Sequence, residues 1–309
     1  MRLTAGTNIG NYTLLERIGN PNMGDVWRAV PTANPSANVV IKSLDSRFEQ
    51  FTSMRDRFEV ECALHQNLVH PNIVPVRECL LHSRERFLVM PFVEGGSLED
   101  RLRSGPLPQQ EAIHIAIQVL DALDHANQHG FVHCDVKPSN ILRQGNRAML
   151  TDFGVAHSFL ESRANDAECS GTIAYMSPEQ IQTPKGVDQR SDVYGLGCVL
   201  YEMLTGRAPF PMNAGESCTD DQIKIMHVTR TPIPPRALCP SIDPRLEQIV
   251  MQALRKRPSD RFAGCGSFAL ALRNLVRTAV PPIRRFPARY AVAIAAGIAV
   301  FALVGAFMS

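Results

Sequence analysis

The segment FVHCDVKPSNIL, residues 131–142, places an aspartate, a lysine and an asparagine between two apolar runs. Apolar flanks around a polar centre are typical of a loop that buried anchors hold rigid, a common way to position reactive groups. The alternative is a solvated turn, because Pro138, Ser139 and Asn140 are common turn residues. The segment alone leaves both interpretations open, and the rest of the chain decides between them.

The composition is that of a globular protein large enough to bury a core. The chain has 309 residues, of which 45% are hydrophobic and 20% are charged, and its formal net charge is +2. This length suits one large domain or two lobes, and the small net charge gives no reason to expect a nucleic-acid partner. The eight cysteines include no CxxC pair, which argues against a zinc site and fits reduced thiols in a cytosol.

The chain changes character near residues 91–96. Before this point, short β-branched and aromatic runs bounded by Gly, Pro and Asn predict strands: YTLLERIG, DVWRAV, NVVIKSL and RFLVMPF. Residues 51–68, between the third and fourth runs, have apolar residues at helical spacing. The later helices are expected at 108–130, 191–206, 243–256 and 267–279, with Ser191 as an N-cap and with Gly130 and Gly206 closing the first two. The pattern predicts a small β-rich lobe followed by a larger helical lobe.

Several short motifs follow one another in a defined order. The turn IGNPNMGDV follows the first strand, Lys42 lies on the third strand, and Glu61 lies in the helix after it. The sequences HCDVKPSN, TDFG, GTIAYMSPE, SDVYGLG and DRF come later. Each motif alone is weak evidence, since a lysine on a half-buried strand usually extends its ammonium into solvent. Their joint order and spacing leave little room for coincidence.

In this order the motifs resemble those of the eukaryotic-like (Hanks-type) Ser/Thr protein kinases of bacteria, over about residues 10–276. The resemblance implies a bilobal α+β kinase fold with an N-lobe at 10–90, a hinge at 91–96 and a C-lobe at 97–276. It implies ATP and Mg²⁺ as cofactors and protein serine or threonine hydroxyls as substrates, and it leaves homodimers or clusters open. Lys137 and Thr172 favour the Ser/Thr class over tyrosine kinases.

The resemblance assigns the catalytic roles to four residues. Asp135 would accept the proton of the acceptor hydroxyl, and Lys137 would steady the γ-phosphate. Asn140 and Asp152 would hold Mg²⁺, a hard cation that prefers oxygen ligands. Phosphoryl transfer needs cations on the phosphates and a carboxylate at the nucleophile, so these residue types suit the chemistry.

The nucleotide site follows from the same resemblance. Lys42 would bind the α- and β-phosphates and would be held by Glu61. Met90 would lie at the back of the adenine pocket, and the backbone of residues 91–93 would face adenine. The implied nucleotide-binding residues are Ile18, Gly19, Asn22, Met23, Gly24, Val26, Lys42, Glu61, Met90 and Val93.

Two further implied contacts support the fold rather than the chemistry. Asp192 would brace the catalytic loop through backbone N–H groups. Glu179 would pair with Arg261. For these residues structural support is the expected role.

The chain departs from the family pattern at two positions. Pro21 stands where a second glycine is expected, and proline lacks an N–H and stiffens the turn. The next three residues keep their N–H groups, so we expect weakened ATP affinity or altered loop mobility rather than lost binding. Cys134 replaces the arginine that precedes the catalytic aspartate in most relatives and that pairs with a phosphate on the activation segment. Because this arginine is missing, the resemblance implies a kinase of the non-RD type. We expect Cys134 itself to be a small, nearly buried filler rather than a redox group.

The C-terminal run YAVAIAAGIAVFALVGAFM, residues 290–308, carries no charge. As a helix it would span about 28 Å, close to the hydrocarbon thickness of a membrane. A basic, proline-containing linker at 277–289 precedes it. The arginines of this linker predict a single-pass protein of the cell membrane with a cytoplasmic kinase domain. Only Ser309 follows, so no outside domain is expected. A buried core helix is the alternative.

Three functions compete at this stage. The first is an active, membrane-tethered Ser/Thr kinase. The second is a pseudokinase that binds nucleotide and partners, which Pro21 and Cys134 suggest, and the third is a membrane-anchored scaffold. The complete set of Lys42, Glu61, Asp135, Asn140 and Asp152 favours the first.

Overall fold

The structure is a computed structural model, and it describes residues 3–18, 25–43, 68–82, 85–153, 173–183, 187–210 and 219–279. The chain divides into one unit of Met1–Arg273 and a second of Asn274–Ser309. The site described below lies in the first unit, as does the fold apart from residues 274–279 at the end of the last helix. The predicted helix at 51–68 falls almost wholly outside the described residues, and the predicted membrane span at 290–308 falls wholly outside them.

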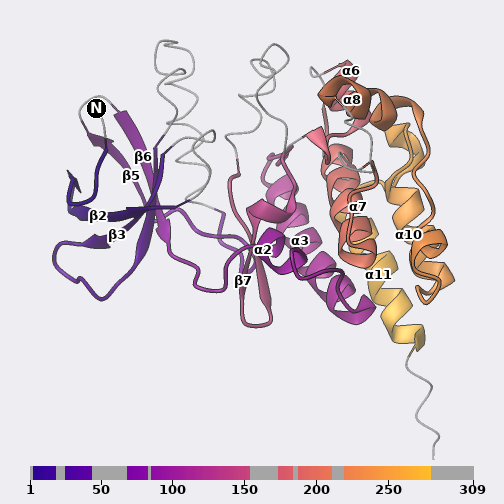
Figure 1. The fold of residues 1–309 in the computed structure, drawn as a ribbon, viewed down its shortest axis with the longest axis horizontal. Coiled ribbons are helices and arrows are strands. Elements are labelled where there is room, and N and C mark those ends of the chain that lie inside the picture. Colours follow the sequence, from indigo (N-terminus) through magenta and orange to yellow (C-terminus); the bar gives the residue numbers. More distant parts are fainter. Residues whose placement is uncertain are drawn as a thin grey trace, which may run out of the picture. The chain divides into compact units, whose positions relative to one another are not determined.

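The first part of the chain forms one antiparallel sheet of six strands (Figure 1). Its strands are β1 (Asn8–Ile9), β2 (Tyr12–Arg17), β3 (Val26–Pro31), β4 (Val39–Ser43), β5 (Glu78–His82) and β6 (Glu85–Pro91). Their order in the sheet is β1-β2-β3-β4-β6-β5. The four strands predicted from the sequence are β2, β3, β4 and β6, and they are confirmed. The short β1 and β5 were not predicted.

The register of the sheet separates a core face from a second face. Ile41 is 1% exposed and belongs to an apolar cluster with Trp27, Phe87 and Val89. Side chains alternate along a strand, so Lys42, next to Ile41, points to the opposite face. Lys42 lies opposite Val26 on β3 and opposite Leu88 on β6. The lysine therefore lies on the face away from this cluster.

The second part of the chain is mostly helical, as predicted. Its helices are α2 (Leu98–Leu102), α3 (Gln109–Gln128), α6 (Pro178–Gln182), α7 (Arg190–Thr205), α8 (Asp220–Thr229), α9 (Pro235–Leu238), α10 (Pro244–Ala253) and α11 (Cys265–Ala279). Two 3₁₀ turns, η3 (Pro138–Asn140) and η4 (Pro258–Asp260), and a hairpin of β7 (Ile141–Gln144) and β8 (Arg147–Leu150) complete it. Helices α3 and α7 pack together, and α7 also packs against α10 (Figure 1).

Helix α7 is the most buried helix among those described, and almost every residue from Ser191 to Leu204 is inaccessible to solvent. Gly206 ends it in the left-handed conformation, with φ 76°, as the sequence predicted. The predicted N-cap at Ser191 is wrong, because the helix begins at Arg190 and Ser191 lies inside it. The Asp188 side chain accepts the N–H of Arg190 at 2.8 Å. The Ser191 hydroxyl instead donates to Glu179 at 2.6 Å.

Within the described residues, no helix has the length and apolar character needed to cross a membrane.

Candidate active site

The backbone of the loop at 131–137 is tied to the buried helix α7. The N–H groups of His133 and Cys134 donate to the two carboxylate oxygens of Asp192, at 3.0 and 2.8 Å. Asp192 is 1% exposed, and burial raises the pKa of its carboxyl, against the lowering effect of His133 and the two N–H groups. The predicted bracing role of Asp192 is confirmed. The loop is rigidly held, as the first interpretation of the segment required.

His133 links this loop to the segment that carries Asp152. Its Nδ1 accepts the N–H of Asp135 at 3.2 Å, so the ring proton lies on Nε2, which is 2.9 Å from the carbonyl oxygen of Thr151. The ring also contacts Phe153 edge-on, with centroids 4.8 Å apart. The sequence analysis did not single out this fully buried histidine. It fixes the spacing between Asp135 and Asp152 through backbone groups on both sides.

Asp135, Lys137 and Asn140 come together in one buried cluster. The Lys137 ammonium lies 2.8 Å from Asp135 Oδ2. The Asn140 amide donates to the same oxygen at 3.1 Å and to the carbonyl oxygen of Asp135 at 2.9 Å. The turn η3 sets this spacing, since the N–H of Asn140 donates to the carbonyl of Lys137 at 3.0 Å. An aspartate in this setting has its carboxylate oriented before any substrate arrives.

Lys42 of β4 reaches the second predicted metal ligand. Its ammonium lies 2.9 Å from Asp152 Oδ2, with both side chains mostly buried. Burial alone would raise the pKa of the Asp152 carboxyl, but the Lys42 charge and hydrogen bond, helped by Lys137 and His133, hold that pKa below its usual value. Asp152 is therefore ionised at neutral pH. Its backbone has φ 67°, in the left-handed region that residues other than glycine seldom adopt.

Three of the residues predicted to bind the nucleotide, Val26, Lys42 and Met90, lie on the second face of the sheet. Val26 and Met90 share this face with Lys42, because Val26 is opposite Lys42 and Met90 is opposite Val40. Met90 is 5% exposed, and its sulfur accepts the Thr151 hydroxyl at 3.9 Å. The hinge residue Val93 is also buried.

Of the remaining predicted nucleotide ligands, Ile18 lies within the described residues. The N–H of Ile18 donates to the carbonyl of Val26 at 2.7 Å, which joins the residue after β2 to the first residue of β3. Gly19, Asn22, Met23, Gly24 and Glu61 lie outside the described residues. Their roles, and the predicted Lys42–Glu61 contact, stay predictions.

The donor set fits Mg²⁺. Asp152 supplies an ionised carboxylate, and Asn140, whose amide nitrogen is bound to Asp135, presents an amide oxygen. Mg²⁺ prefers such oxygen ligands and takes the rest from water and substrate phosphates. Asn140 and Asp152 would hold the ion. Lys42 would neutralise part of the negative charge of the phosphates, together with the ion.

Cys134 lies in an apolar and acidic environment. It is 8% exposed and packs against Val187 and the half-buried Val132. Burial raises the pKa of its thiol far above the usual range, and Asp192, Asp135 and Glu179 add to the effect. The predicted role of Cys134 as a buried filler is confirmed, and its thiol is held protonated.

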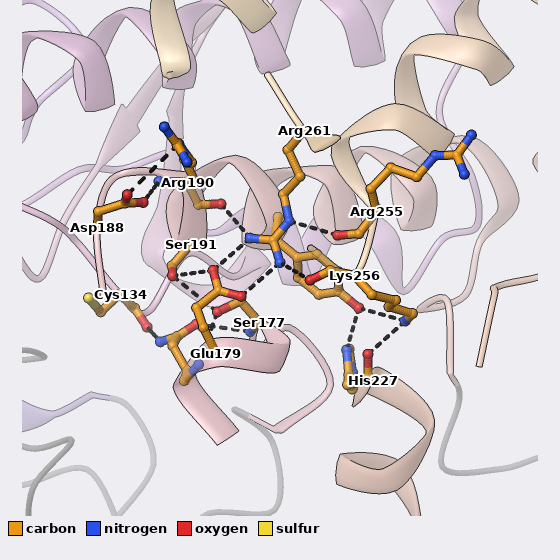
Figure 2. Close-up of polar contacts among 12 residues, drawn as sticks. Cys134, Ser177, Glu179, Asp188, Arg190, Ser191, His227, Arg255, Lys256 and Arg261 are labelled. Carbon is orange, nitrogen blue, oxygen red and sulfur yellow. Dashed lines mark hydrogen bonds and ion pairs between the residues drawn. The ribbon is translucent and has the colours of Figure 1, made fainter. Parts of the chain in front are cut away.

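A polar network leads from Cys134 toward η4 (Figure 2). Arg261 binds both carboxylate oxygens of Glu179, at 2.6 and 2.7 Å, which confirms the predicted pair. Burial would raise the pKa of Glu179, but the hydrogen bonds and charge of Arg261 lower it. One member of the network, Gln180, was missed. The Ser-x-x-Gln spacing of Ser177 and Gln180, which is typical of a helix capping box, was the available signal.

The chain is similar to known protein kinases over most of its length. The model of the protein kinase domain family matches residues 12–271. Serine/threonine-protein kinase PknJ of Mycobacterium tuberculosis is 31% identical over 275 residues, which cover 87% of this chain and 46% of the relative. The probable serine/threonine-protein kinase CPE1738 of Clostridium perfringens is 36% identical over 263 residues, or 83% of this chain and 37% of the relative.

A solved protein kinase structure has the same fold. The crystal structure of the PknI kinase domain of Mycobacterium tuberculosis superposes with a TM-score of 0.68 at 26% identity, covering 88% of this chain and 99% of that domain. The chain spans less than half the length of the two curated relatives.

Proposed function

The chain belongs to the protein kinase family, and on that premise we propose that it transfers the γ-phosphate of ATP to serine or threonine hydroxyls of proteins. The observation that carries the proposal is the Asp135 carboxylate, which contacts Lys137 at 2.8 Å and Asn140 at 3.1 Å. The same loop is bonded through its backbone to α7. This arrangement suits a base that must meet an acceptor hydroxyl in one orientation.

The proposed reaction forms a bond from the acceptor oxygen to the γ-phosphorus and breaks the bond from that phosphorus to the leaving oxygen of ADP. The hydroxyl proton passes to the Asp135 carboxylate. Lys137, beside that carboxylate, stabilises the negative charge of the transferred phosphoryl group. Lys42 binds the phosphates that stay with ADP. Mg²⁺, when bound, neutralises charge on the phosphates.

The test incubates the chain with γ-labelled ATP, Mg²⁺ and a protein acceptor, followed by phosphoamino-acid analysis. Label on serine or threonine that is lost in Asp152→Ala is the expected result, because this variant removes a metal ligand and leaves the apolar cores intact. Absence of label with the native chain would overturn the proposal and favour a nucleotide-binding pseudokinase or scaffold.

We propose further that activity does not depend on phosphorylation of the activation segment. Cys134 takes the place of the phosphate-binding arginine, and Val187, Asp192, Asp135 and Glu179 make its surroundings apolar and acidic. Such surroundings repel a phosphate. The lost contact, worth about 1.5–3 kcal/mol in a charged hydrogen bond, would shift a two-state equilibrium by about tenfold or more.

Phosphatase treatment tests this proposal. The treated chain, and a variant with alanine at Ser158, Ser162 and Ser170, should phosphorylate an exogenous substrate at rates within about threefold of the untreated chain. A loss of more than about tenfold in either would mean that another basic residue, such as Arg163 or Arg55, binds the phosphate.

A membrane tether is the last part of the proposal. The uncharged run at 290–308 and the arginines before it support a single-pass protein with its kinase domain in the cytoplasm, where clustering or a partner would control activity. The full chain should sediment with membranes after lysis, and a chain truncated after Ala279 should not. A full chain that stays in the supernatant would contradict the tether.

A further inference from the structure

The backbone of Cys134, which leads into the peptide bond to Asp135, has an unusual conformation. Cys134 has φ 60°, and among the described residues only Asp152 shares this left-handed region without being glycine. This region is sterically unfavourable for a residue that has a Cβ atom, so neighbouring groups must hold Cys134 in it. Because a peptide unit is planar, the orientation of this one sets the direction in which the chain enters Asp135.

Both polar groups of that peptide unit are bound. Its N–H, which belongs to Asp135, donates to His133 Nδ1 at 3.2 Å. Its carbonyl oxygen, which belongs to Cys134, accepts a hydrogen bond from Gln180 Nε2 at 2.7 Å. The first bond comes from within the loop, whereas the second comes from α6, 46 residues later in the sequence.

The Gln180 amide has one orientation available. The side-chain Oε1 accepts the N–H of Ser177 at 2.9 Å, and the backbone N–H of Gln180 donates to Ser177 Oγ at 3.3 Å, which together form the capping box of α6. The oxygen is therefore committed to Ser177, and the nitrogen is directed at Cys134. Gln180 is 6% exposed, and a small cavity between α6, α7 and the loop is lined by Gln180, Cys134, Asp135 and Asp192.

The N-terminus of α6 is itself held in place by hydrogen bonds. Ser177 donates to Ser191 at 3.1 Å, Ser191 donates to Glu179 at 2.6 Å, and Glu179 pairs with Arg261 (Figure 2). This chain of contacts leaves Gln180 little freedom to follow a displaced loop. The Cys134 carbonyl must therefore adopt the place that α6 dictates.

We propose that Gln180 is a positioning residue for the proposed base, Asp135, and that it acts by holding the Cys134–Asp135 peptide through its amide N–H. The inference rests on the proposed kinase function. Within the described residues, Gln180 hydrogen-bonds to Ser177 and Cys134 and to none of the residues proposed to bind a phosphate, so its loss should affect turnover and spare nucleotide binding. It also makes the geometry of Asp135 depend on α6, the helix that follows residues 173–177.

The test separates two roles of Gln180: the hydrogen bond that its amide N–H donates to Cys134, and the capping of α6 by its amide oxygen. Gln180→Glu keeps an oxygen for the Ser177 N–H but replaces the amide donor with a carboxylate that faces the Cys134 carbonyl. The matched control is Gln222→Glu in the capping box of α8, where Gln222 Oε1 accepts the N–H of Thr219 at 2.8 Å on the surface. Both variants make the same chemical change in the same motif.

The expected result is a loss of kcat of about tenfold or more in Gln180→Glu, with the KM for ATP within about twofold of the native value. Gln222→Glu should stay within about twofold in both constants. Melting temperature and binding of a fluorescent ATP analogue measure the folded fraction. If Gln180→Glu does not fold, Gln180→Met, which has similar length and no donor, replaces it with the same expectation; because methionine also lacks the capping oxygen, its matched control is Gln222→Met.

The pH dependence of kcat in Gln180→Glu gives a second test. It should differ from that of the native chain if Gln180 positions Asp135, and it should not differ if Gln180 only caps α6. A protonated carboxyl can donate its O–H to the Cys134 carbonyl. Burial and the acidic groups Asp192, Asp135 and Glu179 favour protonation, and the Lys137 and Arg261 charges, which pair with Asp135 and Glu179, oppose it in part. The ratio of variant to native kcat should therefore rise from about pH 8 to about pH 6. Changes at the acidic groups themselves affect both proteins and cancel in the ratio.

The outcomes distinguish the two proposals. An active native chain whose kcat is unchanged in Gln180→Glu overturns the positioning role, and so does an equal loss of ATP affinity and turnover. A native chain without phosphoryl transfer overturns the kinase function itself.

Discussion

Replacing Arg261 with methionine should destabilise the kinase domain more than any exchange of an exposed ion pair. The Arg261 side chain is fully buried. All five of its N–H donors are used: two bind Glu179, and three bind the carbonyls of Arg190, Lys256 and Arg255 at 2.7–2.9 Å. Arg261→Met leaves a largely buried carboxylate and three carbonyl oxygens without this donor.

The magnitude follows from burial. Removing one partner of a buried ion pair costs about 3–5 kcal/mol, a large part of the about 5–15 kcal/mol that a domain has in total. For a domain of this size each kcal/mol lowers the melting temperature by about 2–4 °C. Arg261→Met should therefore melt about 6–20 °C below the native chain.

Thermal and urea unfolding measure this difference, and Arg273→Met is the control. Arg273 also contacts both carboxylate oxygens of its partner, Asp121, at 2.6 Å, but its side chain is 43% exposed. An exposed pair contributes about 1 kcal/mol or less, so Arg273→Met should melt within about 4 °C of the native chain. Equal losses in the two variants would refute the argument from burial. Adding Glu179→Gln to Arg261→Met should recover part of the loss, because the unpaired charge is gone.

Three further perturbations have defined outcomes. Lys42→Met should weaken ATP binding and abolish transfer while the chain still folds, with a lower melting temperature because the mostly buried Asp152 loses its ion-pair partner; near-native activity would contradict its assignment to the phosphates. Burial and the Lys256 charge lower the pKa of His227 to about 3, so the unfolded chain binds a proton that the folded chain excludes. The His227 contribution to stability should fall as pH drops from about 6.5 toward 3, by up to about 1.4 kcal/mol per pH unit, and His227→Gln should show a correspondingly shallower loss of stability over this range. A Cβ at Gly195 would lie 3.2 Å from Val136 Cβ and 3.4 Å from the Val136 carbonyl oxygen; Gly195→Ala should displace the catalytic loop and lower kcat, and an unchanged kcat would show that the loop can adjust.

The sequence predicted the elements whose signals are local. Strands β2, β3, β4 and β6 have continuous apolar or β-branched runs, and Gly206 ends α7 because glycine adopts the left-handed conformation without strain. Short elements such as β1, α2 and α6 have too few residues for a periodic pattern. They form because tertiary contacts and capping boxes hold them.

Sequence motifs identified the residues of the candidate site, but they did not predict most of the contacts among them. Asp135, Lys137 and Asn140 were identified by their motif, and the structure joins them in one cluster. Ser191 was wrongly predicted as an N-cap, because its hydroxyl binds Glu179, a partner distant in sequence. Gln180 was missed for a similar reason: its main contact, the Cys134 carbonyl, is 46 residues away. Such long-range hydrogen bonds leave no periodic trace in a sequence.

The most direct test of the proposed active site is a single-turnover measurement on Asp135→Asn. The rate of phosphoryl transfer from saturating ATP to a protein acceptor is compared with that of the native chain, and the Kd for ATP is measured separately. Loss of the base should lower the rate by about a hundredfold or more and leave the Kd within about threefold, because Asp135 acts at the acceptor hydroxyl. A native rate in Asp135→Asn, or a rate loss explained entirely by weaker ATP binding, would contradict the assignment of Asp135 as the base.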